Sequence, residues 1–142
     1  NLGVIYHLRK ESDKAEREYR KSLGLNPKEP MAHNNLGILY METGRLELAE
    51  QFFKKEIAVN PDFAEAYFNL GLVYFEKEKH NEAVALWEKT VELDPKFIRA
   101  YKQLAAYYLG KNDLGQFNYY ANELKSKIGS NARSGINRIG TE

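Results

Sequence analysis

The side chains of this sequence that could do chemistry are few and scattered. His7, His33 and His80 are its three histidines, and none has a second histidine at helical spacing or carboxylates placed to complete a metal site. No Gly-x-x-x-x-Gly-Lys phosphate loop occurs. The absence of cysteine excludes disulfides, thiolate metal sites and thiol catalysis. We therefore expect no catalytic residue, no metal site and no cofactor, and predict that the chain is not an enzyme.

The composition is that of an ordinary soluble globular protein, with 43% hydrophobic and 29% charged residues. A formal net charge of +1 gives no reason to expect nucleic acid as a partner. The charge is uneven, because residues 1–95 carry 13 basic and 17 acidic groups whereas residues 96–142 carry 8 and 3. The basic C-terminal end could orient an acidic partner.

No apolar run approaches the roughly 20 residues that cross a bilayer, and the N-terminus lacks a signal-peptide pattern. We therefore expect no membrane insertion, and the cytoplasm is the default location. The chain begins without Met inside a predicted helix. We expect it to be a piece of a longer protein.

A period of 34 residues organises the chain. Five columns of similar residues share this period, which chance does not explain. The columns are Asn1-Leu2-Gly3, Asn35-Leu36-Gly37, Asn69-Leu70-Gly71 and Gln103-Leu104-Ala105; Tyr6, Tyr40, Tyr74 and Tyr108; Ala15, Ala49 and Ala83; Tyr19, Phe53 and Trp87; and Pro27, Pro61 and Pro95.

Each column has a physical interpretation. Tyr67, Leu70 and Tyr74 form one apolar stripe of a helix. Gly71 lies in that stripe because a second helix, carrying Ala83 and Trp87, must come close there. The Asn-Pro and Asp-Pro pairs are interpreted as an N-capping side chain before a proline at the first helical position.

The pattern predicts four antiparallel helix pairs joined by short turns such as Thr43-Gly44 and His80-Asn81. The pairs are residues 1–9 with 13–24, 28–43 with 45–60, 62–78 with 81–93, and 96–109 with 112–127. They define one domain, residues 1–128, with repeats of approximately 1–29, 30–63, 64–97 and 98–128. Residues 129–142 lack periodicity and are predicted to be a flexible C-terminal tail.

Tyr-x-x-Leu-Gly-x-x-Tyr, Ala-x-x-x-Trp and Pro in residues 67–95 resemble the signature of the tetratricopeptide repeat family. The resemblance covers residues 1 to about 128. It implies an all-α fold, a right-handed superhelical solenoid of about four repeats, the first truncated and the last degenerate. Ala105, Phe117 and Ala121 depart from the family pattern in that last repeat.

A second stripe lies beside the packing stripe on the first helix of each repeat. The resemblance implies that it faces the concave groove of the solenoid, where a protein or peptide ligand binds. The predicted groove residues are Asn34, Asn35, Ile38, Met41, Glu65, Phe68, Asn69, Leu72, Phe75, Arg99, Lys102 and Gln103.

Two features of this stripe have alternative interpretations. Asn1, Asn35, Asn69 and Gln103 form a ladder of amides that either holds the backbone of an extended peptide or serves hairpin packing. The apolar groove residues either bind a ligand or pack against the neighbouring repeat. If the first interpretations hold, Phe68→Ala or Asn69→Ala should abolish binding and leave helicity nearly intact.

Some members of the family hold acidic chaperone tails with a clamp of Lys, Asn and Arg residues. Here Asn69 and Arg99 match that clamp, but Asn34, Ile38 and Gln103 depart from it, so a chaperone-tail receptor is disfavoured. We predict a non-catalytic protein-interaction scaffold. The alternatives are a substrate-recruiting arm of a larger enzyme, which the full open reading frame would reveal, and self-association, which a concentration-independent monomer would exclude.

Overall fold

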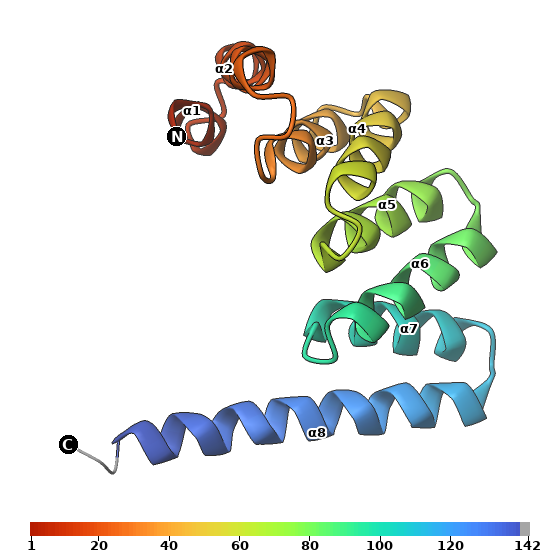
Figure 1. Ribbon diagram of the computed structural model, residues 1–142. Coiled ribbons are helices and arrows are strands. Elements are labelled where there is room, and N and C mark those ends of the chain that lie inside the picture. Colours follow the sequence, from red (N-terminus) through yellow and green to blue (C-terminus); the bar gives the residue numbers. More distant parts are fainter. Residues whose placement is uncertain (140–142) are drawn as a thin grey trace. The chain divides into compact units, whose positions relative to one another are not determined.

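A computed structural model describes the backbone of residues 1–139 and the side chains of residues 1–130. These residues form eight α-helices and no strand (Figure 1). The helices are α1 (Leu2–Leu8), α2 (Ser12–Leu25), α3 (Ala32–Glu42), α4 (Leu46–Val59), α5 (Ala64–Glu76), α6 (His80–Leu93), α7 (Ile98–Gly110) and α8 (Leu114–Ile139).

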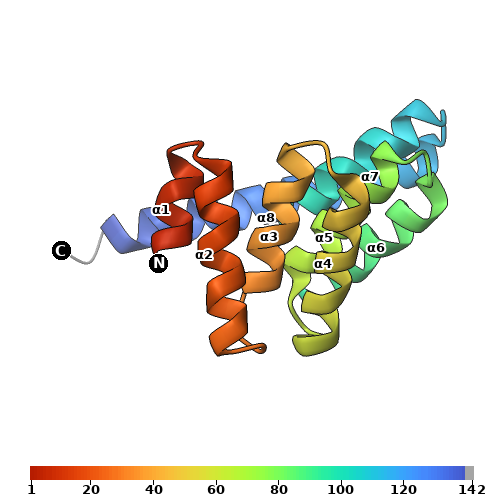
Figure 2. The same cartoon turned by 90° about the horizontal axis from the view of Figure 1, so that it is seen from above.

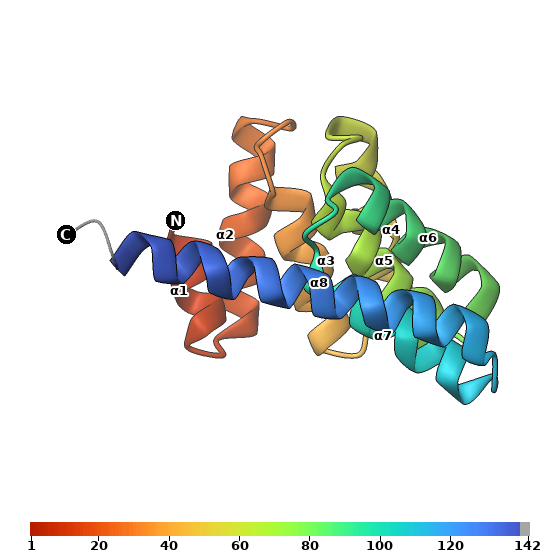
Figure 3. The same ribbon diagram turned by 90° about the horizontal axis from the view of Figure 1, so that it is seen from below.

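The chain divides into two compact units, Asn1–Leu86 and Trp87–Glu142, with the boundary inside α6. In the first unit, α1 packs on α2 and α3 packs on α4 as helical hairpins (Figure 2). In the second unit, α7 packs on α8 (Figure 3). The predicted all-α architecture of antiparallel helix pairs is confirmed.

The turns inside the hairpins share one geometry. Each has a residue in the left-handed region, with φ between 57° and 74°, at Lys10, Gly44, Glu78 and Asn112. In the α3–α4 turn, the Gly44 N–H donates to Met41 O at 3.1 Å and the next N–H donates to Tyr40 O at 2.8 Å. These are the two bonds of a Schellman motif. The third turn is therefore centred on Glu78, and the prediction of a turn at His80-Asn81 is wrong because α6 begins at His80.

The prolines do not begin helices, which corrects the predicted N1 positions. After Asn26-Pro27, helix α3 begins only at Ala32. The Lys28 N–H donates to Asn26 Oδ1 at 3.1 Å and the Glu29 N–H donates to Asn26 O at 3.0 Å. Asn and Pro therefore occupy the first two positions of a β-turn, where both are favoured. The predicted helix starts at 28, 62 and 96 lie two to four residues too early.

The core of the first unit is built from the repeating columns. Ala15, Tyr19, Leu36, Tyr40, Ala49 and Phe53 are among its buried residues. A Cβ on Gly37 would lie 2.5 Å from the Phe53 ring. Because Phe53 is fully buried and cannot retreat, the close approach predicted for this glycine column requires a residue without a side chain.

The last helix is longer than predicted. Helix α8 continues to Ile139, so the predicted helix end near residue 127 is wrong. A glycine in a helix interior is about 1 kcal/mol less favourable than an alanine. Gly129 nevertheless lies inside α8. Residues 140–142 are outside the part of the chain that the structure describes. The flexibility predicted for residues 129–142 stays a prediction.

Candidate protein-binding surface

The predicted groove residues of the first unit lie on α3 and α5, which are neighbours in that unit (Figure 2). Those that a partner could contact are half-buried or exposed: Asn35, Ile38, Met41, Glu65, Leu72 and Phe75. The remaining three, Asn34, Phe68 and Asn69, are buried. The structure thus divides the predicted set into an outer layer and an inner layer.

The inner layer contains a hydrogen bond that the sequence analysis did not predict. Asn69 Nδ2 donates to Asn34 Oδ1 at 3.1 Å, and both side chains are buried. Asn1 instead caps α1, because its Oδ1 accepts the Gly3 N–H at 2.9 Å. Burial of the Asn69 amide, together with its bond to Asn34, leaves little of it for a ligand. Exposed Asn1 and half-buried Asn35 are the ladder amides of this unit that a ligand could approach.

Glu56, on α4, is a buried carboxylate that bonds to the backbone of Asn34. Its side chain is fully buried, and Oε2 accepts the backbone N–H of Asn34 at 3.1 Å. Asn60 Nδ2 donates to the other carboxylate oxygen. A buried carboxylate needs such partners to offset its desolvation. Sequence reasoning missed Glu56, although its position three residues after Phe53 places it on the buried face of α4.

Met31 lies immediately before α3 and adds an apolar side chain to this surface. Its backbone is left-handed, with φ of 66°, a conformation that costs a non-glycine residue about 1–2 kcal/mol. Its side chain is 48% exposed. Together with Val59, Pro61 and Phe63 it lines a pocket of about 480 Å³. The 34-residue period puts Met31 in the same column as Glu65, a predicted groove residue.

Three predicted groove residues lie on α7 in the second unit. Arg99 and Lys102 are exposed and Gln103 is half-buried. The Arg99 guanidinium lies 5.0 Å from the centre of the Phe97 ring, a cation–π distance. This segment can therefore present positive charge to a ligand.

Among the described residues, no group of three or more His, Cys, Asp or Glu side chains could hold a metal ion. No helix in this part of the chain combines the length and apolar character that crossing a membrane demands.

Family comparisons agree with the repeat architecture. Tetratricopeptide repeat models match residues 1–29, 18–51, 39–77 and 64–97. The chain therefore belongs to the tetratricopeptide repeat family. No curated protein sequence matches it.

Solved structures share the fold over most of the chain. The MamA RS-1 ArsTM double mutant is 24% identical with a TM-score of 0.80, covering 92% of this chain and 73% of its own. A crystal structure of MamA is 25% identical with a TM-score of 0.60, covering 94% and 98%. PilF of Pseudomonas aeruginosa is 23% identical with a TM-score of 0.82, covering 89% of this chain and 58% of its own. At these identities the likeness is one of fold.

Proposed function

We propose that this chain is a non-catalytic scaffold that binds an apolar segment of a partner protein on the α3–α5 surface. This surface consists of Met31, Asn35, Ile38, Met41, Glu65, Leu72 and Phe75. The observation that carries the proposal is the exposure of two large apolar side chains on it. Met31 is 48% exposed and Phe75 is 39% exposed.

The apolar residues alone support only modest affinity. Burying a large apolar side chain contributes about 1.5–3 kcal/mol, so three side chains covered by a ligand contribute about 5–9 kcal/mol. Association itself costs an estimated 4–15 kcal/mol. Polar contacts must therefore contribute, and Asn35 and Glu65 are the polar side chains of the α3–α5 surface that a ligand can reach.

Two of the predicted groove residues, Phe68 and Asn69, are unsuitable for testing this proposal because they are buried. Phe68 is 2% exposed and Asn69 is 3% exposed. Substituting either one alters packing before it alters a ligand contact. Partner binding is better tested through Met31 and Phe75, whose side chains a ligand can meet without rearrangement of the fold.

The experiment is affinity capture from the source-cell lysate by the wild-type chain and by the Met31→Ser/Phe75→Ser variant, with partners quantified by mass spectrometry. We expect at least one partner to fall about tenfold or more with the variant, since losing two apolar contacts removes about 1.5 kcal/mol or more. The captured partner is then purified and titrated calorimetrically against both chains.

Leu25→Ser is the matched control, because Leu25 is 82% exposed and lies on α2, outside the α3–α5 surface. Circular dichroism establishes that all three chains are equally helical. Equal partner recovery by the wild type and the double variant would contradict the proposal. Equal loss with Leu25→Ser would show that general surface apolarity, rather than this surface, determines capture.

A further inference from the structure

The repeat pattern breaks at His33, whose Nδ1 lies 3.9 Å from Glu56 Oε2. The same column holds Tyr67 and Tyr101 in the next two repeats. The Tyr67 hydroxyl donates to Pro61 O at 2.8 Å, and the Tyr101 hydroxyl donates to Pro95 O at 3.0 Å. His33 is shorter than tyrosine and has no hydroxyl to reach Pro27, the corresponding proline.

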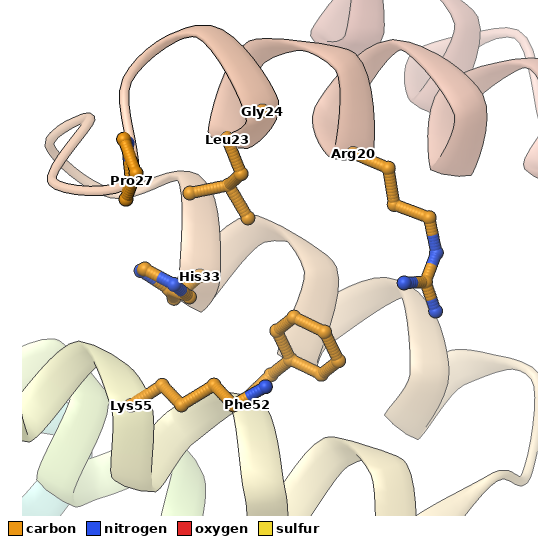
Figure 4. A pocket seen from close by; sticks show the side chains of 7 residues that line it. All are labelled: Arg20, Leu23, Gly24, Pro27, His33, Phe52 and Lys55. Atoms are coloured by element: carbon orange, nitrogen blue, oxygen red, sulfur yellow. The ribbon is translucent and has the colours of Figure 1, made fainter.

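A pocket of about 270 Å³ lies at this position in the first unit, between α2, α3 and α4. Figure 4 shows its lining side chains, with Pro27 and Leu23 on one side of His33 and Phe52 on another. The remaining lining residues are Arg20, Gly24 and Lys55. The volume is below the about 300–1,000 Å³ of typical small-molecule sites and suits one side chain of a partner.

The lining is positively charged. It contains Arg20 and Lys55 and no carboxylate. Arg20 is held in place, because its Nε donates to Glu16 Oε1 at 3.0 Å and one terminal nitrogen donates to the Tyr40 hydroxyl at 2.6 Å. A guanidinium has five N–H donors, so three of them are not used by these two bonds.

Lys55 differs from its neighbour in sequence. Lys54 pairs with Glu50 at 2.6 Å, whereas Lys55 has no hydrogen bond or ion pair with the described residues and lies 4.6 Å from the centre of the Phe52 ring. Its ammonium group can therefore accept an anion without giving up an existing carboxylate.

His33, which lines the pocket, also has a ring nitrogen without a hydrogen bond. The residue is 9% exposed, and its buried Nδ1 has no hydrogen-bond partner. The nearest carboxylate, Glu56 Oε2, is 3.9 Å away, beyond hydrogen-bond distance. Burial lowers the pKa of His33, the charge of Glu56 opposes this, and the charge of Lys55 adds to it.

We propose that this pocket binds an acidic side chain of a partner protein, at a site separate from the α3–α5 surface. Leu23, Pro27 and Phe52 form apolar walls for the methylene stem. Arg20 and Lys55 provide charge-assisted hydrogen bonds to the carboxylate. The site is independent of the proposed binding of an apolar segment, because it shares no residue with that surface.

The probe is an acetylated and amidated peptide of alternating leucine and glutamate, titrated into the ¹⁵N- and ¹³C-labelled chain and followed by NMR. We expect shifts of amides beside the pocket and of the His33 ring. Binding places a negative charge opposite Lys55, so the pKa of His33, which faces Arg20, Lys55 and Glu56, should rise. The same peptide with glutamine in place of glutamate should bind at least about threefold more weakly.

Two variants test the pocket, and the first also removes the contact of Lys55 with the Phe52 ring. Lys55→Ala should weaken binding of the glutamate peptide about three- to tenfold. Gly24→Leu should abolish the shifts by filling the pocket, since a Cβ at Gly24 meets no atom within 4 Å. Lys21→Ala is the charge-matched control, because exposed Lys21 lies on α2 outside the pocket.

Equal binding of the glutamate and glutamine peptides, or unchanged binding by both Lys55→Ala and Gly24→Leu, would overturn the proposal. Inorganic phosphate is the second probe. If phosphate reproduces the shifts at millimolar concentration and competes fully with the peptide while the leucines contribute nothing, the pocket is a free-anion site and the assignment to a protein side chain is wrong.

Discussion

The junctions between hairpins are built differently in the two units. In the first unit, a carboxylate lies at each junction and accepts bonds from a tyrosine of the next repeat and from cations. Glu16 accepts from the Tyr40 hydroxyl at 2.6 Å, and Glu50 accepts from the Tyr74 hydroxyl at 3.1 Å. Arg45 pairs with Glu16 at 3.1 Å. These two carboxylates are 34 residues apart, so the arrangement repeats with the fold.

In the second unit the corresponding tyrosine, Tyr108, also bonds to a carboxylate, and it stacks on a second tyrosine within the α7–α8 hairpin. Val84, near the end of the first unit, occupies the column of Glu16 and Glu50, and the accepting carboxylate of the second unit is Glu88. In the second unit the Tyr108 and Tyr120 rings lie 5.7 Å apart and within 5° of parallel, and their hydroxyls donate to Glu88 at 3.4 and 3.3 Å. In both units a carboxylate therefore accepts the hydroxyl of the repeating tyrosine. The first unit adds cations to that carboxylate, Arg45 at Glu16 and Lys77 at Glu50, whereas the second adds Tyr120 of α8, which stacks on Tyr108.

The largest expected effect comes from removing the junction tyrosine itself. Tyr40→Ala removes a fully buried ring and should lower the free energy of unfolding by about 3–5 kcal/mol. Tyr108→Ala removes a half-buried ring and should lower it by about 1–2 kcal/mol. Urea unfolding followed by circular dichroism measures both. Equal losses would break the comparison between the two units.

The effect of acid sharpens the same comparison. Partial burial favours the neutral form of Glu50, but hydrogen bonds from Lys54 and Lys77, the charge of Lys54 and a bond from Tyr74 together lower its pKa from 4.5 to about 2. Because the pKa of Glu50 is lower in the folded chain than in the unfolded chain, its contribution is present above about pH 4.5 and is lost as the pH falls toward 2.

Glu50→Gln should therefore lose less stability than the wild type when the pH falls from 5 to 3, measured by urea unfolding at each pH. Glu76→Gln is the control, since Glu76 is exposed at the end of α5 and the substitution changes the net charge equally. The same pH dependence in both variants would mean that Glu50 is not a source of acid sensitivity.

The smallest expected effect concerns the left-handed turn residues. Glu78→Gly relieves a backbone with φ of 59° and should raise the free energy of unfolding by about 0.5–1 kcal/mol, after the entropy that glycine loses on folding. Asn112→Gly in the second unit should gain less, because asparagine tolerates this conformation better than glutamate. Thermal unfolding measures both. A loss of stability with Glu78→Gly would show that its side chain contributes to the turn.

Much of the fold could be predicted because its cause is local. Leu36, Tyr40 and Phe53 recur at the repeat period, and this spacing determines which side of each helix must be buried. The proline turns were misplaced, since an Asn-Pro pair fits both a helix start and a β-turn. The extension of α8 was missed because residues 129–139 carry no periodic apolar pattern.

The candidate surface could be predicted only as a stripe. Periodicity placed Asn69 and Phe75 on one side of α5, but it could not distinguish the buried amide from the exposed ring. That distinction depends on Asn34, a residue on another helix and 35 positions away. His33 could have been noticed from its column, where tyrosine occupies the following repeats.

The sequence by itself determined the repeat, the pairing of helices and the residues of the core, because helix geometry converts a 34-residue period directly into buried faces. Only the tertiary structure decided that Asn69 bonds to Asn34, that Glu56 is buried and that a cationic pocket lies beside His33. Each of these depends on the distance between side chains of different helices, and that distance is set by packing across the hairpins rather than by spacing along the chain.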